Sequence, residues 1–189
     1  MAKQLEIEFK TLLTKEEYQK LIERFSNYKG NYQTNYYFDT PRFTLKATDI
    51  GLRVRVRDSY ELTLKRRKHY SIIETNKIIS KEIFEEFLEN GIVPDEEIRN
   101  EIAGIIGNQK LVNFMSLTTY RVNVPYKNGL LAIDKCEYLG EVDYELEYEA
   151  TSYEQGKREF VEIVNEFGVK YKKSEAKIKR AYAALRKKI

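Results

Sequence analysis

The segment Glu6-Ile-Glu-Phe-Lys10 places two carboxylates and an ammonium group at every second position of the chain. Side chains alternate between the two faces of a β-strand, so Glu6, Glu8 and Lys10 are expected on one face and the apolar residues between them on the other. Carboxylate oxygens can hold a hard divalent cation, and an ammonium group can bind phosphate oxygens. The same alternation occurs on ordinary surface strands, so its meaning depends on the rest of the chain.

Charged residues alternate in the same way in later segments, and each segment carries mainly one sign. The basic positions are Arg53, Arg55 and Arg57 in segment 51–58, Lys65 and Arg67 in segment 60–67, and Arg121. The acidic positions are Asp134 in segment 130–138, and Asp143, Glu145, Glu147 and Glu149 in segment 141–150. Like charges on one strand face repel each other unless opposite charges lie nearby.

Two interpretations fit these charged faces. The first is a sheet with one solvated face and one core face, which explains most alternating strands. The second is a closed lumen across which basic and acidic strands face each other. A lumen lined by both signs matches a polyanion with bound metal, because Arg and Lys hold phosphate oxygens while carboxylates hold bridging divalent ions. An eight-stranded barrel has room for side chains or one small ligand, which suits a narrow polyphosphate chain.

The composition restricts the kind of metal site that the chain can form. One histidine and one cysteine exclude a protein-only zinc site of the usual type. Carboxylate ligands instead favour Mg²⁺ or Mn²⁺. The single cysteine, Cys136, also excludes an internal disulfide, and His69 is predicted to be a solvated loop residue.

The length and charge of the chain indicate its broad class. The 189 residues favour one domain, and a hydrophobic fraction of 42% is enough for a core. A net charge of +3 gives only weak attraction to nucleic acid, and the basic tail 180–188 is interpreted as an exposed helix end. We find no apolar stretch near the roughly 20 residues of a membrane span and no secretory signal, so we expect a cytoplasmic protein without a membrane or a clear nucleic-acid partner.

Periodicity and capping residues predict the secondary structure. Eight strands are predicted, over residues 3–11, 31–38, 51–58, 60–67, 71–79, 117–126, 130–138 and 141–150. Helices are predicted after capping boxes at 14–17 and 152–155, across 80–106 with a break at 91–94, and over 174–188. These elements predict a single α+β domain over residues 1–189, with a helical insertion near 80–106.

The charged motifs, taken in order, resemble those of the CYTH superfamily, the triphosphate tunnel metalloenzymes, in its small single-domain bacterial branch. Glu6-x-Glu8-x-Lys10 resembles the ExExK signature of that family. Further matches follow in order: Tyr37-Phe-Asp-Thr40, Leu52-Arg-Val-Arg55, Leu62-Thr-Leu-Lys65, Thr119-Tyr-Arg121, Asp134, Glu145-Leu-Glu147 and Lys177-x-x-Arg180. The first motif alone is weak, whereas the ordered set spans residues 5–181 and is highly specific.

The resemblance implies a closed eight-stranded antiparallel β-barrel with flanking helices, in whose tunnel triphosphate binds with Mg²⁺ or Mn²⁺. The metal ligands that it implies are Glu6, Glu8, Asp134, Glu145 and Glu147. The phosphate-binding residues that it implies are Lys10, Arg53, Arg55, Lys65, Arg121, Lys177 and Arg180. The implied catalytic residues are Glu6, Glu8 and Lys10, of which Lys10 could bind phosphate or orient the nucleophilic water. Arg180 could instead pair with a carboxylate.

The C-terminal motif departs from the family pattern at one position. That pattern reads Ser-Lys-x-x-Arg, whereas Ala176 stands in the serine position and Ser174 lies two residues earlier. The lysine of the motif is therefore either Lys177 or Lys173.

The resemblance implies metal-dependent hydrolysis of a triphosphate, with inorganic triphosphate expected first and an organic one such as thiamine triphosphate second. Two alternatives remain, namely an adenylyl cyclase of the same fold and a non-catalytic polyphosphate- or nucleotide-binding module. We see no clear base-reading motif for cyclisation, and the retained Glu6, Glu8 and Lys10 argue against a pure binding module. The physiological substrate stays open because the phosphate-binding residues are common to these alternatives.

Overall fold

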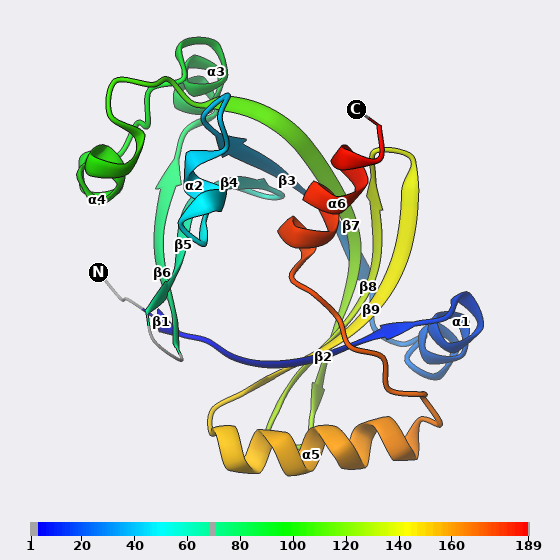
Figure 1. The fold of residues 1–189 in the computed structure, drawn as a ribbon. Helices are drawn as coiled ribbons and strands as arrows, with labels where there is room; N and C mark the ends of the chain where they lie inside the picture. The colour runs from blue at the N-terminus through cyan, green and yellow to red at the C-terminus, as the bar shows by residue number, and fades with distance from the viewer. Residues whose placement is uncertain (1–3, 69–70, 189) are drawn as a thin grey trace. The chain divides into compact units, whose positions relative to one another are not determined.

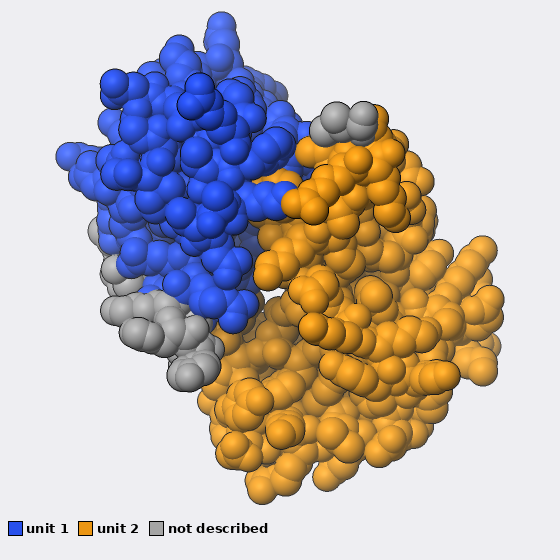
Figure 2. Space-filling view, viewed as in Figure 1, with its two compact units in different colours: residues 1–5, 34–116 blue, residues 6–33, 117–189 orange. Residues whose placement is uncertain are grey.

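The computed structural model describes residues 4–68 and 71–188 (Figure 1). The chain divides into a first unit, residues 1–5 with 34–116, and a second unit, residues 6–33 with 117–189 (Figure 2). Both units combine antiparallel strands with helices, which confirms the predicted α+β class. Within the described ranges, no helix has both the length and the apolar character needed to cross a membrane. His69 lies outside the described residues, and the single-domain organisation stays a prediction.

The first unit is built on antiparallel strands in the order β1, β6, β5, β4, β3. Their bounds are β1 (Gln4–Leu5), β3 (Gly30–Asp39), β4 (Ile50–Val56), β5 (Tyr60–Lys68) and β6 (Ser71–Ile79). In β4, Leu52 is fully buried and pairs with the buried Leu64 of β5. Arg53 is the next residue of β4, so its side chain projects to the opposite face of the sheet.

Three helices belong to the first unit, namely α2 (Thr44–Ala47), α3 (Lys81–Asn90) and α4 (Glu96–Ile106). Phe87 of α3 stacks on Phe38 of β3 with ring centroids 4.1 Å apart, and Ile98 of α4 is buried in the same core. The segment predicted as helical, 80–106, therefore holds two helices. The first of them ends at Gly91, whose φ of 69° is the left-handed conformation that glycine favours at helix ends.

The second unit is built on antiparallel strands in the order β7, β8, β9, β2. Their bounds are β2 (Ile7–Leu13), β7 (Val112–Tyr126), β8 (Gly129–Tyr138) and β9 (Glu141–Ala150). The helices are α1 (Lys15–Arg24), α5 (Tyr153–Glu166) and α6 (Lys177–Arg186). Leu21 of α1 and Ile163 of α5 pack into one core with Ile133 and Leu146, so α1 and α5 cover the apolar face of these strands. Figure 1 shows α5 lying along that face.

Several element boundaries differ from the prediction. The predicted strand 3–11 is divided at Glu6, because β1 pairs with β6 in the first unit and β2 pairs with β9 in the second. Strand β7 begins at Val112 rather than at residue 117, and α6 begins at Lys177 rather than at residue 174. Helix α2 was not predicted. The late start of α6 follows from the preceding residues, since Lys173 forms a β-bridge with Thr11.

The two predicted capping boxes have different outcomes. The box at α1 is confirmed, because Thr14 Oγ1 accepts from the Glu17 N–H at 3.1 Å and Glu17 accepts from the Thr14 N–H at 2.7 Å. The box at α5 is wrong, since Ser152 is the N-cap but makes no side-chain capping bond. The Gln155 amide that should complete it donates instead to Glu159 at 3.1 Å.

Gly156 of α5 gives a prediction about packing in the second unit. Replacing a helical glycine with alanine normally stabilises a protein by about 0.5–1 kcal/mol. A Cβ at Gly156, however, would lie 2.4 Å from the Cβ of Ala150 and 2.8 Å from the ring of Phe9. We expect Gly156→Ala to lower the free energy of unfolding by about 1–3 kcal/mol, the usual cost of overpacking, in urea titrations.

Gly104 of α4 is the matched control for this variant. A Cβ there would meet nothing within 4 Å, so Gly104→Ala is expected to raise the free energy of unfolding by about 0.5–1 kcal/mol. Stabilisation by both substitutions would show that α5 does not approach β2 and β9 as closely as described.

Candidate functional site

The strands of the second unit bring predicted acidic and basic residues to one face of the sheet. Asp134 of β8 pairs in register with Arg121 of β7 on one side and with Glu145 of β9 on the other. Lys10 of β2 pairs with Glu147 of β9. Because paired positions project to the same side of a sheet, the register gathers residues that are far apart in the sequence. Helices α1 and α5 cover the opposite face.

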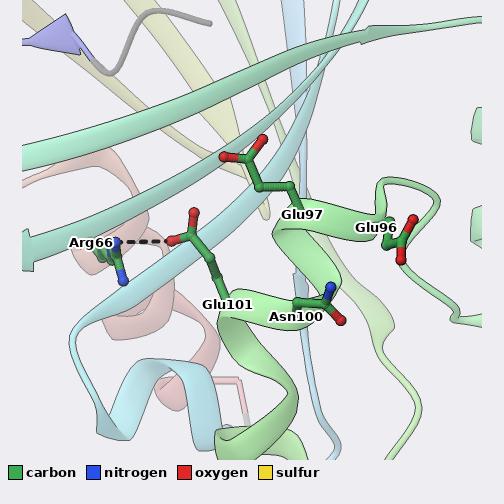
Figure 3. Close-up of a pocket in the computed structure, with 5 residues that line it drawn as sticks. All are labelled: Arg66, Glu96, Glu97, Asn100 and Glu101. Carbon is green, nitrogen blue, oxygen red and sulfur yellow. Dashed lines mark ion pairs between the residues drawn. The ribbon is translucent and has the colours of Figure 1, made fainter.

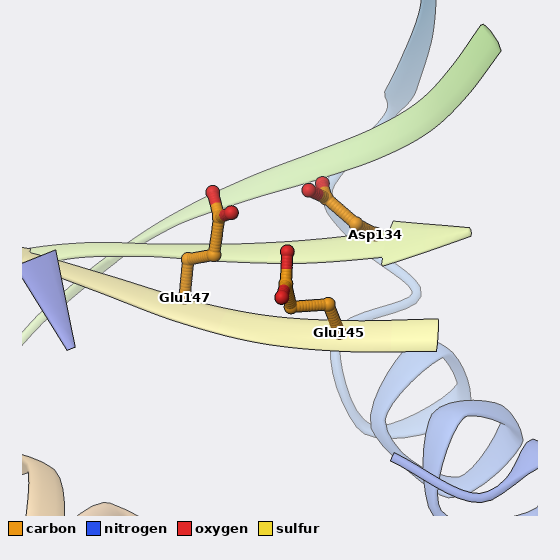
Figure 4. Close-up of side chains that lie close together, drawn as sticks. All are labelled: Asp134, Glu145 and Glu147. Carbon is orange, nitrogen blue, oxygen red and sulfur yellow. The ribbon is translucent and has the colours of Figure 1, made fainter. Parts of the chain in front are cut away.

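The acidic centre of this face consists of Asp134, Glu145 and Glu147 (Figure 4). All three residues are buried, and one carboxylate oxygen of each lies within 4.8 Å of the others. Buried carboxylates this close together are unfavourable unless cations lie among them. We call these three residues the carboxylate cluster.

Lys177, the first residue of α6, supplies one of these cations. Its Nζ lies 2.9 Å from Asp134 and donates hydrogen bonds to Glu145 and Glu147. Burial alone would lower the pKa of Lys177, but the surrounding carboxylates raise that pKa well above its usual value. The side chain of Lys173, the alternative lysine of the motif, is 82% exposed. The structure therefore places Lys177, and not Lys173, at the carboxylate cluster.

Arg121 supplies a second cation to the carboxylate cluster. Its guanidinium group donates to both oxygens of Asp134, at 2.7 and 2.6 Å, and to Glu147 at 2.5 Å. Burial would raise the pKa of Glu147, but the charges of Lys177 and Arg121 hold that pKa well below its ordinary value. Glu147 is therefore an anion at neutral pH.

The negative charge of Glu8 is less well balanced by nearby cations than the charges of the carboxylate cluster are. Glu8 accepts a hydrogen bond from the Lys10 ammonium at 2.8 Å, yet burial, followed by the charge of Glu147, raises its pKa. The negative charge of Glu6, at the break between β1 and β2, contributes to the same shift. The anionic form of Glu8 is thus less stable here than in water, and a bound cation would stabilise it.

Arg180, one turn further along α6, also contacts carboxylates. It donates to Asp143 at 2.9 and 3.2 Å and to Glu145 at 2.7 Å. The hydroxyl of Tyr138 donates to Asp143 at 2.6 Å. The structure therefore shows the carboxylate pairing that the sequence left open for Arg180, and phosphate binding by Arg180 stays a prediction.

Ser174 belongs to this site although the sequence did not predict it there. Its hydroxyl donates to Glu145 and accepts from the Arg180 guanidinium at 2.9 Å. Its position two residues before the family's serine was visible in the sequence, but its contact with Glu145 depends on how the segment before α6 folds.

The first unit carries Arg53, Arg55 and Lys65 on the sheet face opposite its core. Lys65 pairs with Glu74 of β6 at 2.9 Å, and Arg55 pairs with Glu61 of β5 at 3.6 Å. Burial would raise the pKa of Glu74, but Lys65 and Arg53 lower it. Neither acidic partner was predicted from the sequence, although each lies directly across the strand pair from its basic residue.

Two buried donors on this face have no hydrogen-bond partner among the described residues. They are the Nε of Arg53 and the Oγ1 of Thr63, and these residues are cross-strand neighbours on β4 and β5. Buried polar groups in native proteins are nearly always hydrogen-bonded. An added acceptor, such as water or a phosphate oxygen, would complete the hydrogen bonding of these two groups.

A separate hollow beside α4 is lined by none of the predicted site residues. Its volume is about 640 Å³, and its lining is Arg66, Glu96, Glu97, Asn100 and Glu101 (Figure 3). Arg66 forms an ion pair with Glu101 at 3.1 Å. Because the glutamates outnumber the arginine, this hollow is acidic and unsuited to a triphosphate.

The chain matches a known family and a curated relative over its length. Residues 4–182 match the family model described as the CYTH domain. YjbK of Bacillus subtilis (strain 168), whose name proposes a triphosphatase, is 32% identical over 193 residues, which cover 100% of both chains.

Two solved structures share the fold. A Bacillus halodurans protein described as a proposed adenylate cyclase is 34% identical, with a TM-score of 0.89 over 95% of this chain and 98% of that one. HpAC1 of Hippeastrum, a proposed adenylyl cyclase described as having a dominant triphosphatase activity, is 24% identical, with a TM-score of 0.77 over 97% of this chain and 96% of that one. The likeness to HpAC1 shows the fold alone.

Proposed function

We propose that this chain, which belongs to the CYTH domain family, is a metal-dependent triphosphatase that hydrolyses inorganic triphosphate or an organic triphosphate such as thiamine triphosphate. One observation carries the proposal, namely that three buried carboxylates, Asp134, Glu145 and Glu147, surround a cation in the second unit. The proposed activity of YjbK, at 32% identity, supports the same reaction. From the family resemblance we also propose that the strands close into an eight-stranded tunnel and that the protein is cytoplasmic.

The residues present fit a hard divalent cation. Every proposed ligand atom is a carboxylate oxygen, which Mg²⁺ and Mn²⁺ prefer. The ammonium group of Lys177 lies among the three buried carboxylates and stands in for a metal ion there. We propose that the metal ligands are Glu6, Glu8, Asp134, Glu145 and Glu147. When bound, the metal would neutralise phosphate oxygens and lower the pKa of a water molecule.

The basic residues of the chain are proposed to bind and orient the substrate. Arg121 and Lys177 carry fixed positive charge, since neighbouring carboxylates overcome burial and raise both pKa values well above normal. In the first unit, the unpartnered Nε of Arg53 supports phosphate binding. The complete proposed phosphate-binding set is Lys10, Arg53, Arg55, Lys65, Arg121, Lys177 and Arg180.

The reaction needs little covalent chemistry from the protein. The water oxygen forms a bond to a terminal phosphorus while the bond from that phosphorus to the bridging oxygen breaks, and negative charge grows on the leaving group. Positioned cations stabilise that charge without reorganising during the reaction. Lys10, whose Nζ lies 2.8 Å from Glu8, is proposed to donate a hydrogen bond to a phosphate oxygen or to the attacking water.

Cyclisation of a nucleotide is the second candidate, because the Bacillus halodurans relative is described as a proposed adenylate cyclase. One assay separates the candidates. The protein is incubated with Mg²⁺ or Mn²⁺ and, in parallel, with inorganic triphosphate, ATP or thiamine triphosphate, and phosphate, pyrophosphate and cyclic AMP are measured. Metal-dependent release of phosphate is expected. Pyrophosphate with cyclic AMP from ATP would favour the cyclase, and tight binding without any product would favour a binding module.

A further inference from the structure

Glu145 has different partners on its two carboxylate oxygens. Oε1 accepts a hydrogen bond from the Lys177 ammonium group. Oε2 accepts hydrogen bonds from the Ser174 hydroxyl and, at 2.7 Å, from the Arg180 guanidinium group. Glu145 is fully buried, so water does not supply further donors to these oxygens. The two donors on Oε2 fix the orientation of the carboxylate and leave Oε1 directed at the carboxylate cluster.

Hydrogen bonds on both sides of Ser174 hold its segment in place. Before it, the segment is fixed to β2, because Lys172 N–H donates to Thr11 Oγ1 at 2.8 Å and Leu12 N–H donates to the Lys172 carbonyl at 3.2 Å. After it, Arg180 donates to Ser174 Oγ at 2.9 Å and to the Glu175 carbonyl at 2.5 Å. Because the chain is fixed before and after Ser174, the Ser174 side chain has little freedom to turn away from Glu145.

We propose that Ser174 is a positioning residue for the metal ligand Glu145, whose Oε2 it binds so that Oε1 stays available to the cation. This inference rests on the proposed function. Groups that hydrogen-bond a metal ligand fix its geometry, and their loss typically costs 10–100-fold in metal affinity or activity.

The test measures metal binding directly. Mn²⁺ binding to the full chain without substrate is followed by electron paramagnetic resonance, and thermal unfolding is recorded for each variant. We expect Ser174→Ala to weaken Mn²⁺ binding roughly 10–100-fold while the protein remains folded at the temperature of the measurement. Ser174→Thr keeps the hydroxyl and should bind Mn²⁺ nearly as the wild type does. Ser152→Ala, which removes an exposed hydroxyl that makes no capping bond in the same unit, is the matched control and should be unchanged.

Kinetics provide a second readout. At saturating Mn²⁺, Ser174→Ala should retain most of the wild-type kcat, while the Mn²⁺ concentration for half-maximal rate rises by the same factor as the dissociation constant. Equal Mn²⁺ affinity in Ser174→Ala and wild type would overturn the inference, and so would a loss that Ser174→Thr fails to rescue. If the wild type itself binds no Mn²⁺, the proposed function fails instead, which keeps the two failures distinguishable.

Discussion

Glu8→Gln is expected to lower the rate of triphosphate hydrolysis by about 10³-fold or more while leaving the fold intact. Metal ions supply several kcal/mol of charge stabilisation, and each ~1.4 kcal/mol is tenfold in rate. The amide keeps the size of the side chain but removes its charge from the proposed ligand set. Burial and the charge of Glu147 already disfavour the anionic form of Glu8, so the neutral amide should unfold at an equal or slightly higher temperature. Measuring kcat and thermal unfolding on the same preparation tests both statements.

Glu149→Gln is the matched control for this variant. Glu149 pairs with Glu8 across β2 and β9, but its side chain is exposed and it is not a proposed metal ligand. The rate of hydrolysis by Glu149→Gln should therefore stay near that of the wild type. A wild-type rate for Glu8→Gln would rule out the metal assignment, and equal losses in both variants would indicate a general need for negative charge on this face.

The alternation of side chains allowed the sequence to predict much of the fold and the composition of the charged faces. The alternation is a local property, so Asp134 and Glu145 could be assigned to the charged faces of their strands without knowing their neighbours. Their mutual pairing depends on strand register, which the structure supplies. The family resemblance inferred from the ordered motifs is confirmed by the match over residues 4–182.

The features that were not predicted correctly from the sequence depend on which partner a side chain binds. The sequence of a capping box is present at Ser152, but Gln155 binds Glu159 instead. Ser174 donates to Glu145 from a segment that Lys172 fixes to Thr11 on β2, far away in the sequence. Periodicity cannot report such contacts, because it assigns a residue to a face of its element and does not identify the partner that its side chain binds.

The sequence left open whether Lys173 or Lys177 is the lysine of the C-terminal motif. The position of Lys177 in the structure leads to a prediction about stability. Lys177→Met leaves three buried carboxylates without the ammonium group that they surround. Removing one partner from a buried ionic cluster typically costs about 3–5 kcal/mol. For a chain of this size that corresponds to roughly 6–20 °C in unfolding temperature, measured in the presence of EDTA. Added Mn²⁺ should recover a large part of the loss, because binding to the folded state alone stabilises it.

The pH dependence of stability tests independently whether Lys177 stabilises the carboxylate cluster. The pKa of Glu147 is held below its usual 4.5 in the wild type, so the stabilisation is fully present above that pH and is lost as the pH falls through the lower folded-state value. The difference in stability between wild type and Lys177→Met should therefore be larger at about pH 7 than at about pH 4. Lys173→Met is the control, since Lys173 is highly exposed and its pair with Glu175 lies at the surface. Equal destabilisation by the two substitutions would contradict the placement of Lys177 in the carboxylate cluster, because only a buried cation can be essential to carboxylates that water does not reach.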